Sequence, residues 1–246
     1  MKITLPGRLT KLFLVFAFLP IGALSTQSEN QARKQAQAAI AIPDPYAAAV
    51  AKEILMRGGN AVDAAVATGF ALAVTYIDAG NIGGGGFMLT HIGGESAFLD
   101  YREKASILAN RDMYLDDRGE LIENATLIGA RAAAVPGTVA GMWAAHQRYG
   151  SLRWQELVQP AIELAQNGFV PAQILVDEIR TNLDRFGDKT NFKKYFSQIS
   201  ADQPFKQPEL AMTLERIAEK GPADFYQGET ARLIVQQMEK DHGLIN

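Results

Sequence analysis

The sequence predicts an α+β fold in which helices dominate. Three observations predict it: two capped apolar helices between residues 45 and 74, a hairpin signal near residue 93, and helical periodicity from residue 139 onward. A sheet that is stable by itself usually has three or more strands and a covered face, whereas this pattern provides two strands. We therefore expect a helix-rich chain whose sheet is incomplete.

The first two helices are marked by their ends. Asp44-Pro45 places an N-cap before a proline at the first helical position, and Gly58-Gly59 ends that helix. Asn60 and Asp63 have the spacing of a capping box, which opens a second helix over 61–74. Because this second helix is apolar nearly all round, we expect it to be buried on several sides.

A glycine cluster at 83–86 joins the second helix to two predicted strands, 87–91 and 96–101, which Gly93-Gly94 connect. The cluster has neither the G-x-G-x-x-G register nor a following Lys-Ser or Lys-Thr, so it does not fit a nucleotide loop. Its expected role is close packing. For Asn81 in the same loop we expect a role in the turn, with a hydrogen bond to substrate as the alternative.

The remaining predicted elements are helices. They cover residues 139–149, 159–168, 171–186, 208–220 and 228–242. Pro160 is interpreted as lying at the start of the second of these, because proline is favoured there. Residues 188–207 have no clean period, so we expect a loop with short turns.

Composition excludes several classes of function. The chain has 246 residues and a net charge of −3, with no long basic run that would indicate nucleic-acid binding. It has no cysteine, hence no disulfide and no thiolate nucleophile. The histidines His91, His146 and His242 lie on different predicted elements without paired spacing, and no serine lies in a G-x-S-x-G elbow. We expect no metal and no cofactor.

Residues 1–25 have the features of an export signal. A basic start precedes an apolar stretch at 12–24, and Ala23-Leu24-Ser25 offers a cleavage site. An uncleaved anchor is the alternative, but it would need about 18 uninterrupted apolar residues, and Pro20 and Gly22 interrupt this stretch. We expect an exported protein, periplasmic or secreted, without stable membrane insertion once the signal is removed.

Beyond the signal, the sequence predicts a polar linker at 26–43 and one domain at 44–246. The chain stops directly after a predicted helix, where a loop would normally lead into another element. We therefore expect that the domain is partial and that the sequence is the front portion of a longer protein.

Five blocks in order carry a resemblance to a known family. They are MRGGNAVDAAVA at 56–67, GGGGFM at 83–88, DYRE at 100–103, AVPGTVAG at 134–141 and PAIELAQNGF at 160–169. Together they resemble gamma-glutamyltranspeptidases. The resemblance implies an N-terminal nucleophile hydrolase (αββα) fold, of which this chain is the N-terminal part of the large subunit.

The resemblance also implies a reaction. A precursor cleaves itself into a large and a small subunit, and a threonine at the start of the small subunit attacks, with its own α-amino group as base. The gamma-glutamyl group of glutathione or a related compound passes to water, an amino acid or a peptide. The Thr-Thr-His motif of the nucleophile is absent from this sequence, so we assign no catalytic residue here.

One site residue can be carried over from the family. Arg102 matches the arginine that binds the α-carboxylate of the substrate, and a guanidinium is suited to hold a carboxylate through two parallel hydrogen bonds. The alternative is an arginine that only pairs with Asp100 or Glu103 at a strand end. The resemblance favours the substrate-binding role.

The sequence departs from the family pattern at two places. Ile42-Pro43-Asp44-Pro45-Tyr46 stands where a His-Pro is common, and Ala105-Ser106 stands where Ala-Pro is frequent. These departures indicate a divergent member. A second hypothesis for function is a truncated exported protein without chemistry of its own, which binds a partner such as a separate small subunit.

Overall fold

The structure, a computed structural model, describes residues 38–246. The expected signal peptide and residues 26–37 of the expected linker lie outside the described residues. The elements are α2 (Pro45–Met56), α3 (Ala61–Thr75), β1 (Phe87–Ile92), β2 (Glu95–Asp100), the 3₁₀ turn η1 (Ala130–Ala132), α4 (Thr138–Tyr149), α5 (Trp154–Asn167), α6 (Gln173–Phe186), the 3₁₀ turn η2 (Gly187–Lys189), α7 (Phe192–Phe196), α8 (Pro208–Lys220), α9 (Pro222–Gln227) and α10 (Glu229–Lys240).

Helix α2 begins and ends where the sequence predicts. The carboxylate of Asp44 accepts a hydrogen bond from the amide of Ala47 at 2.7 Å, as an N-cap should. The same oxygen accepts from Oγ1 of Thr75 at 2.8 Å, at the far end of α3. Asp44 therefore caps one helix and ties it to the next, at one of the two places where the sequence departs from the family pattern.

Helix α3 is buried on several sides, as its apolar sequence predicts. It opens with the predicted capping box: Asn60 accepts from the amide of Asp63, and Asp63 accepts from the amide of Asn60 at 2.9 Å. The fully buried carboxylate of Asp63 also accepts from the amide of Ser151 at 3.0 Å. The start of α3 is thus fastened to the turn between α4 and α5.

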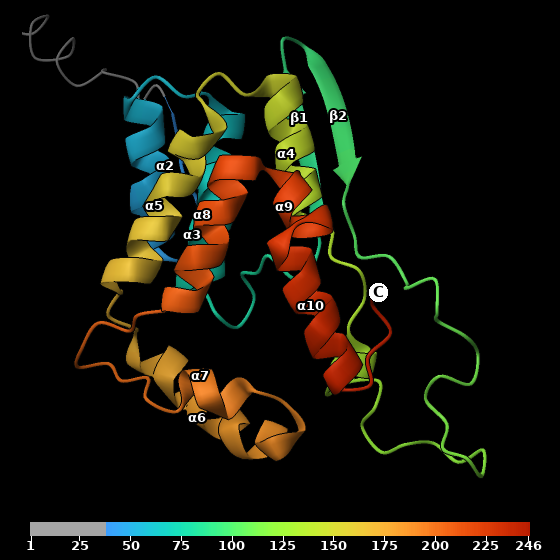
Figure 1. The fold of residues 1–246 in the computed structure, drawn as a ribbon. Coiled ribbons are helices and arrows are strands. Elements are labelled where there is room, and N and C mark those ends of the chain that lie inside the picture. Colours follow the sequence, from blue (N-terminus) through green and yellow to red (C-terminus); the bar gives the residue numbers. More distant parts are fainter. Residues whose placement is uncertain (1–37) are drawn as a thin grey trace, which may run out of the picture. The chain divides into compact units, whose positions relative to one another are not determined.

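The hydrophobic core lies between α2, α3, α5 and α8, which run side by side in Figure 1. Phe70 of α3 meets Trp154 of α5 edge to face, with ring centroids 5.4 Å apart. The indole of Trp154 donates to the carbonyl of Ile217 in α8 at 2.9 Å. Large aliphatic side chains such as Leu157 and Leu214 are completely buried between these helices. The core therefore joins segments from both halves of the described chain.

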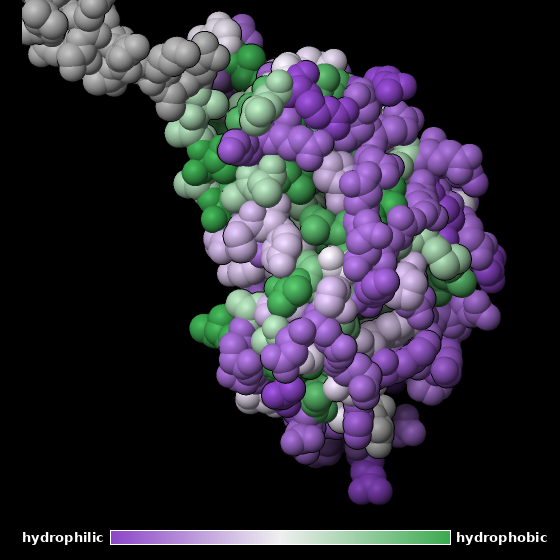
Figure 2. Space-filling view, turned by 90° about the vertical axis from the view of Figure 1, so that its left-hand side faces the viewer, coloured by the Kyte–Doolittle hydropathy of each residue, from purple (hydrophilic) through white to green (hydrophobic). Residues whose placement is uncertain are grey.

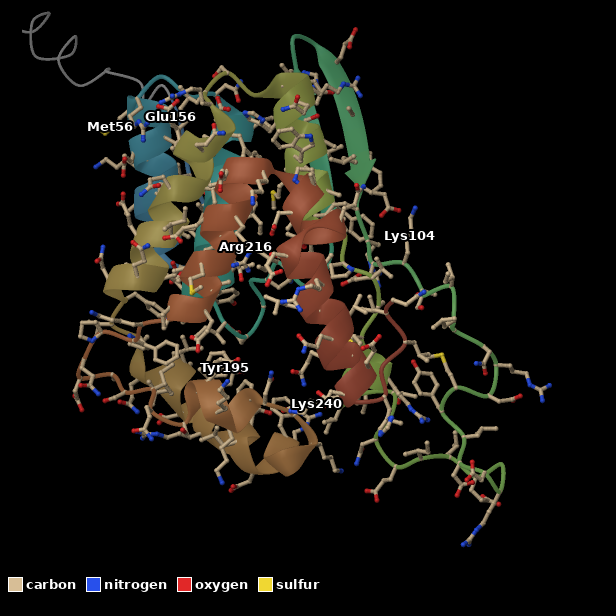
Figure 3. The ribbon with its side chains drawn as sticks, in the orientation of Figure 1. Met56, Lys104, Glu156, Tyr195, Arg216 and Lys240 are labelled. Atoms are coloured by element: carbon tan, nitrogen blue, oxygen red, sulfur yellow. The ribbon has the colours of Figure 1, made fainter. Side chains whose placement is uncertain are left out.

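Helix α5 corrects one prediction. The sequence placed its start at residue 159 because of Pro160, but the helix begins at Trp154 and Pro160 lies inside it. The amide of Arg153 donates to the carboxylate of Glu156 at 3.2 Å, which closes the first turn. Glu156, labelled in Figure 3, also pairs with Arg57 of the α2–α3 connection at 2.6 Å. Burial of the Trp154 side chain outweighs the helix hydrogen bond that proline cannot make.

The two strands form an antiparallel hairpin with Phe87 opposite Asp100 and Leu89 opposite Phe98. Gly93 and Gly94 both have positive φ at its turn, as the sequence predicts. In the part of the chain that the structure describes, these two strands are the whole sheet. One face of the hairpin is strongly exposed, and the stacked rings of Phe87 and Phe98 lie on it.

The C-terminal helices follow the predictions with one omission. Helix α8 has its predicted bounds, and α10 lies within the predicted 228–242. The loop expected at 188–207 contains η2 and the five-residue α7, and α7 packs on α6. The prediction omitted α9, because six residues are too few to display a helical period.

A long segment without α-helix runs from residue 101 to residue 137. The hydroxyl of Ser106 fastens it, since this buried group donates to the carbonyl of Leu244 and accepts from the amide of Leu108 at 3.1 Å. Ser106 stands where the family frequently has proline, whose ring has no hydroxyl to donate. At this second departure from the family pattern, the serine hydroxyl therefore makes hydrogen bonds that a proline could not make.

On the face drawn in Figure 2, hydrophobic residues lie in separate groups among hydrophilic ones. Scattered apolar residues of this kind are normal on the surface of a globular protein. None of the helices over residues 38–246 is both long and apolar enough to cross a membrane.

Candidate functional site

Asn81 shapes the glycine loop between α3 and β1. Its side-chain oxygen accepts hydrogen bonds from the amide of Gly84 at 2.7 Å and from Oγ1 of Thr138 at 3.1 Å. Its side-chain nitrogen donates to the carbonyl of Ala79 at 3.2 Å. These bonds agree with the turn role that the sequence predicted for Asn81.

The loop is also bound to the start of α4. The carbonyl of Gly84 accepts from the amides of Gly137 and Thr138, at 2.7 and 3.0 Å. The hydroxyl of Tyr226 in α9 donates to the carbonyl of Pro136 at 2.9 Å. Burial raises the pKa of Tyr226, so its hydroxyl stays protonated at neutral pH. Two of the five sequence blocks, 83–88 and 134–141, therefore meet in space.

The segment that carries Arg102 is held on both sides of that residue. Before it, Tyr101 exchanges two backbone hydrogen bonds with Gly86, at 3.0 and 3.3 Å. After it, Lys104 exchanges two with Val135, at 3.1 and 2.8 Å. Figure 3 shows Lys104 just beyond the end of β2. The backbone at Arg102 is therefore anchored to the glycine loop and to the segment that leads into α4.

The side chain of Arg102 lies on the exposed face of the hairpin. Its guanidinium carbon is 5.9 Å from the ring centroid of Phe87, and 65% of the side chain is accessible to solvent. Its Nε donates to the carboxylate of Glu103 at 3.1 Å. The amide of Glu103 itself, together with the guanidinium of Arg102, lowers the pKa of that carboxyl. Arg102 has thus made the local pairing that was the alternative to substrate binding, and most of its surface stays open.

The pairing of Arg102 with Glu103 is too weak to block a ligand. An exposed ion pair contributes about 0–1 kcal/mol, whereas one hydrogen bond to a charged group contributes about 1.5–3 kcal/mol. A substrate carboxylate that takes two such bonds would displace Glu103 at little cost. The geometry is therefore compatible with a carboxylate-binding arginine.

His91 and His146 have structural partners. Nδ1 of His91 lies 3.0 Å from the hydroxyl of Ser96 across the hairpin, and Nε2 of His146 lies 2.8 Å from the carbonyl of Leu152. His242 follows α10 with a positive φ. Within residues 38–246, no group of three or more His, Asp or Glu side chains is placed to hold a metal ion.

A cavity of about 830 Å³ lies between α7, α8, α10 and the glycine loop. Tyr195, Arg216 and Lys240 line it from three helices (Figure 3). Arg216 is committed to Asp224, whose carboxylate is almost fully buried 3.4 Å away. Arg102 does not line this cavity, so the cavity and the sequence-predicted site are different places.

Sequence reasoning singled out Arg102 as a candidate but missed the groups that hold its segment. Val135 and Tyr226 were not singled out, although Val135 lies in one of the five quoted blocks. The signal that could have found them is the Pro136-Gly137 pair, since glycine before a helix often marks a close approach of two backbones.

A family model described as gamma-glutamyltranspeptidase matches residues 47–246. The chain belongs to the gamma-glutamyltranspeptidase family. A relative in Pseudomonas aeruginosa, named glutathione hydrolase proenzyme, is 58% identical over 207 residues. That match covers 84% of this chain and 37% of the relative, so the chain spans little more than a third of the length of that protein.

Solved structures of the family have a fold similar to that of this chain. The gamma-glutamyltranspeptidase from Pseudomonas nitroreducens, complexed with L-DON, superposes with a TM-score of 0.83 and is 58% identical; the match covers 85% of this chain and 62% of that chain. The Helicobacter pylori gamma-glutamyltranspeptidase gives a TM-score of 0.81 at 41% identity, and the match covers 87% and 63%. The predicted α+β class is confirmed as the N-terminal portion of the N-terminal nucleophile hydrolase fold.

Proposed function

We propose that this chain forms the large-subunit side of an active site that transfers gamma-glutamyl groups from glutathione and related compounds to water, amino acids or peptides. The observation that carries the proposal is Arg102, held at the end of β2 with its guanidinium open to solvent on the exposed hairpin face. Membership of the gamma-glutamyltranspeptidase family supports the class of reaction.

In this proposal Arg102 binds the α-carboxylate of the gamma-glutamyl group. The guanidinium offers two parallel N–H donors, a geometry that matches the two oxygens of a carboxylate. The nucleophile is a threonine of the small subunit, in sequence that this chain does not contain. The work of the described residues is therefore to bind and orient the donor substrate.

The small subunit is the proposed partner, and the exposed hairpin face is where it would pack. Phe87, Leu89 and Phe98 are 53%, 77% and 65% exposed there. Two strands rarely stand alone in water, so further strands are expected to cover this face. The relatives named as proenzymes support a precursor that is cleaved into two subunits.

We further propose that the protein is exported, with a signal at 1–25 removed and a linker at 26–43 before the domain at 44–246. The basic and apolar pattern of the first residues supports this proposal. N-terminal sequencing of the mature protein should begin near Thr26. A mature protein that begins at Met1 would contradict export with cleavage.

The test of function is release of an aniline from a gamma-glutamyl anilide by the complete coding sequence. Arg102→Ala should raise KM at least about 10-fold, because it removes one or two charge-assisted bonds of about 1.5–3 kcal/mol each. Arg102→Lys should have an intermediate effect, since it keeps the charge and loses the fork.

Arg111→Ala is the matched control. Arg111 also pairs through Nε with the next residue, Asp112, at 3.1 Å, and its side chain is 94% exposed. Its removal should leave KM unchanged. An equal effect of both alanine variants, or none of either, would refute the role of Arg102. A complete protein with no turnover would favour the second hypothesis, an exported protein that only binds a partner.

A further inference from the structure

We infer that Tyr101 is a positioning residue that sets the direction of the Arg102 side chain, and that Gly86 and Gly141 exist to seat its ring. This inference rests on the proposed role of Arg102 and deepens it. The juxtaposition that carries it is the convergence of two glycine-containing blocks on a single tyrosine, next to the arginine in the chain.

The backbone of Tyr101 is enclosed by glycines from both blocks. A Cβ built on Gly85 would lie 2.5 Å from the carbonyl oxygen of Tyr101, and one on Gly137 would lie 2.0 Å from the same atom. Real Cβ atoms do not approach that closely, so a side chain at either position would push the backbone at Tyr101 aside. Glycine is therefore required there by close approach.

The ring of Tyr101 is seated in the same way. A Cβ on Gly141 of α4 would lie 2.2 Å from Cγ of Tyr101, and one on Gly86 would lie 2.9 Å from Cε2. The ring is only half-buried, and burial raises the pKa of its hydroxyl, which stays protonated at neutral pH. These contacts fix the direction of the Tyr101 ring but bury little of its apolar surface.

The hydroxyl of Tyr101 connects this seat to Arg102. It donates to the carbonyl of Phe87 at 3.4 Å, and the ring of Phe87 is the surface over which the guanidinium of Arg102 lies. A shift of the tyrosine ring would therefore move both the backbone before Arg102 and the aromatic surface beneath it. Such a shift should reach substrate only through Arg102, which distinguishes positioning from general packing.

The experiment compares two donors in the complete enzyme: a gamma-glutamyl anilide and the same compound with its α-carboxylate converted to a carboxamide. The measured quantity is kcat/KM for the donor with the α-carboxylate divided by kcat/KM for the donor with the carboxamide. Gly141→Ala should lower this ratio at least about fivefold through KM, with kcat within about twofold, because only part of a charge-assisted contact is lost.

Gly83→Ala is the matched control. Gly83 lies in the glycine loop three residues before Gly86, its φ is negative, and a Cβ there would meet nothing within 4 Å. Its ratio should equal that of the wild type. Tyr101→Phe is the second variant, since it keeps the ring and removes only the hydroxyl. It should lower the ratio about two- to threefold without a change in Tm, as expected for a weak neutral hydrogen bond.

The outcomes separate the inference from the proposed function. If Arg102→Ala leaves the ratio unchanged, the proposed role of Arg102 fails. If Arg102→Ala collapses the ratio while Gly141→Ala weakens both donors equally, Tyr101 serves packing alone and the inference fails. Should Gly141→Ala not fold, the Tyr101→Phe ratio decides: an unchanged value overturns the inference.

Discussion

The helical core and the hairpin face differ in how far their apolar side chains are buried, and their polar groups hydrogen-bonded, by other residues of this chain. Between α2, α3, α5 and α8, large side chains are fully buried by other residues of the chain, and the carboxylate of Asp63 receives hydrogen bonds from three residues. On the hairpin, Phe87 and Leu89 remain mostly exposed. Arg102 lies on this exposed side and has only local partners.

This difference separates stability from function. A core that closes on itself can fix the positions of the glycine loop and of α4 without outside help. The hairpin side carries Arg102, which is proposed to bind substrate, and the apolar surface on which the small subunit is proposed to pack. Changes in the core should therefore act on folding, and changes at the hairpin should act on assembly and binding.

The largest effect is expected in the core, for Asp63→Ala. This change removes the carboxylate that accepts hydrogen bonds from the amides of Asn60, Ser151 and Leu152, and a hydrogen bond to a charged group contributes about 1.5–3 kcal/mol. The complete protein should lose at least about 3 kcal/mol of stability or fail to accumulate. Thermal unfolding measures this, with exposed Asp117→Ala as the control expected within about 0.5 kcal/mol.

The stability provided by Asp63 should depend on pH. Burial alone would raise the pKa of Asp63, but hydrogen bonds from Ser151, Asn60 and Leu152 outweigh burial and hold it below its usual value. A folded-state pKa below the unfolded value of about 3.9 gives stability that is present above that pH and is lost as pH falls further. The difference in Tm between wild type and Asp63→Ala should therefore narrow below about pH 4. A difference that is constant from pH 3 to 7 would contradict this origin.

A smaller effect should distinguish the two surfaces directly. Leu89 on the hairpin and Met56 at the end of α2 are both 77% exposed, and the chain has no cysteine of its own. In the complete protein, Leu89→Cys should react with a thiol reagent at least about tenfold more slowly than Met56→Cys, because the proposed small subunit would bury the hairpin face. Equal rates would show that nothing covers the hairpin.

Much of the fold could be predicted because its signals are local. The caps at Asp44 and Asn60, the Gly93-Gly94 turn and the proline that opens α8 fix element ends within a few residues. The predicted start of α5 was wrong because a proline such as Pro160 is favoured at a helix start. Only the packing of Trp154 against α8 shows that the helix begins at Trp154 and not at residue 159.

The site was less predictable than the fold. Arg102 was reached through its resemblance to a family, since a strand-end arginine alone favours a local pair. The seat of Tyr101 was missed because it joins Gly86 to Gly141, which are far apart in sequence, and no local pattern records that contact. Gly83 belongs to the same sequence block as Gly86, yet a Cβ on it would meet nothing within 4 Å, so the sequence does not say which of these glycines is packed closely.

The most direct test of the account is a crystal structure of the complete enzyme with a bound gamma-glutamyl ligand. The account predicts that Arg102 leaves Glu103 and holds the α-carboxylate through two N–H···O bonds of about 2.7–2.9 Å. A ligand whose α-carboxylate is held by other groups, with Arg102 still paired to Glu103 and facing solvent, would contradict it.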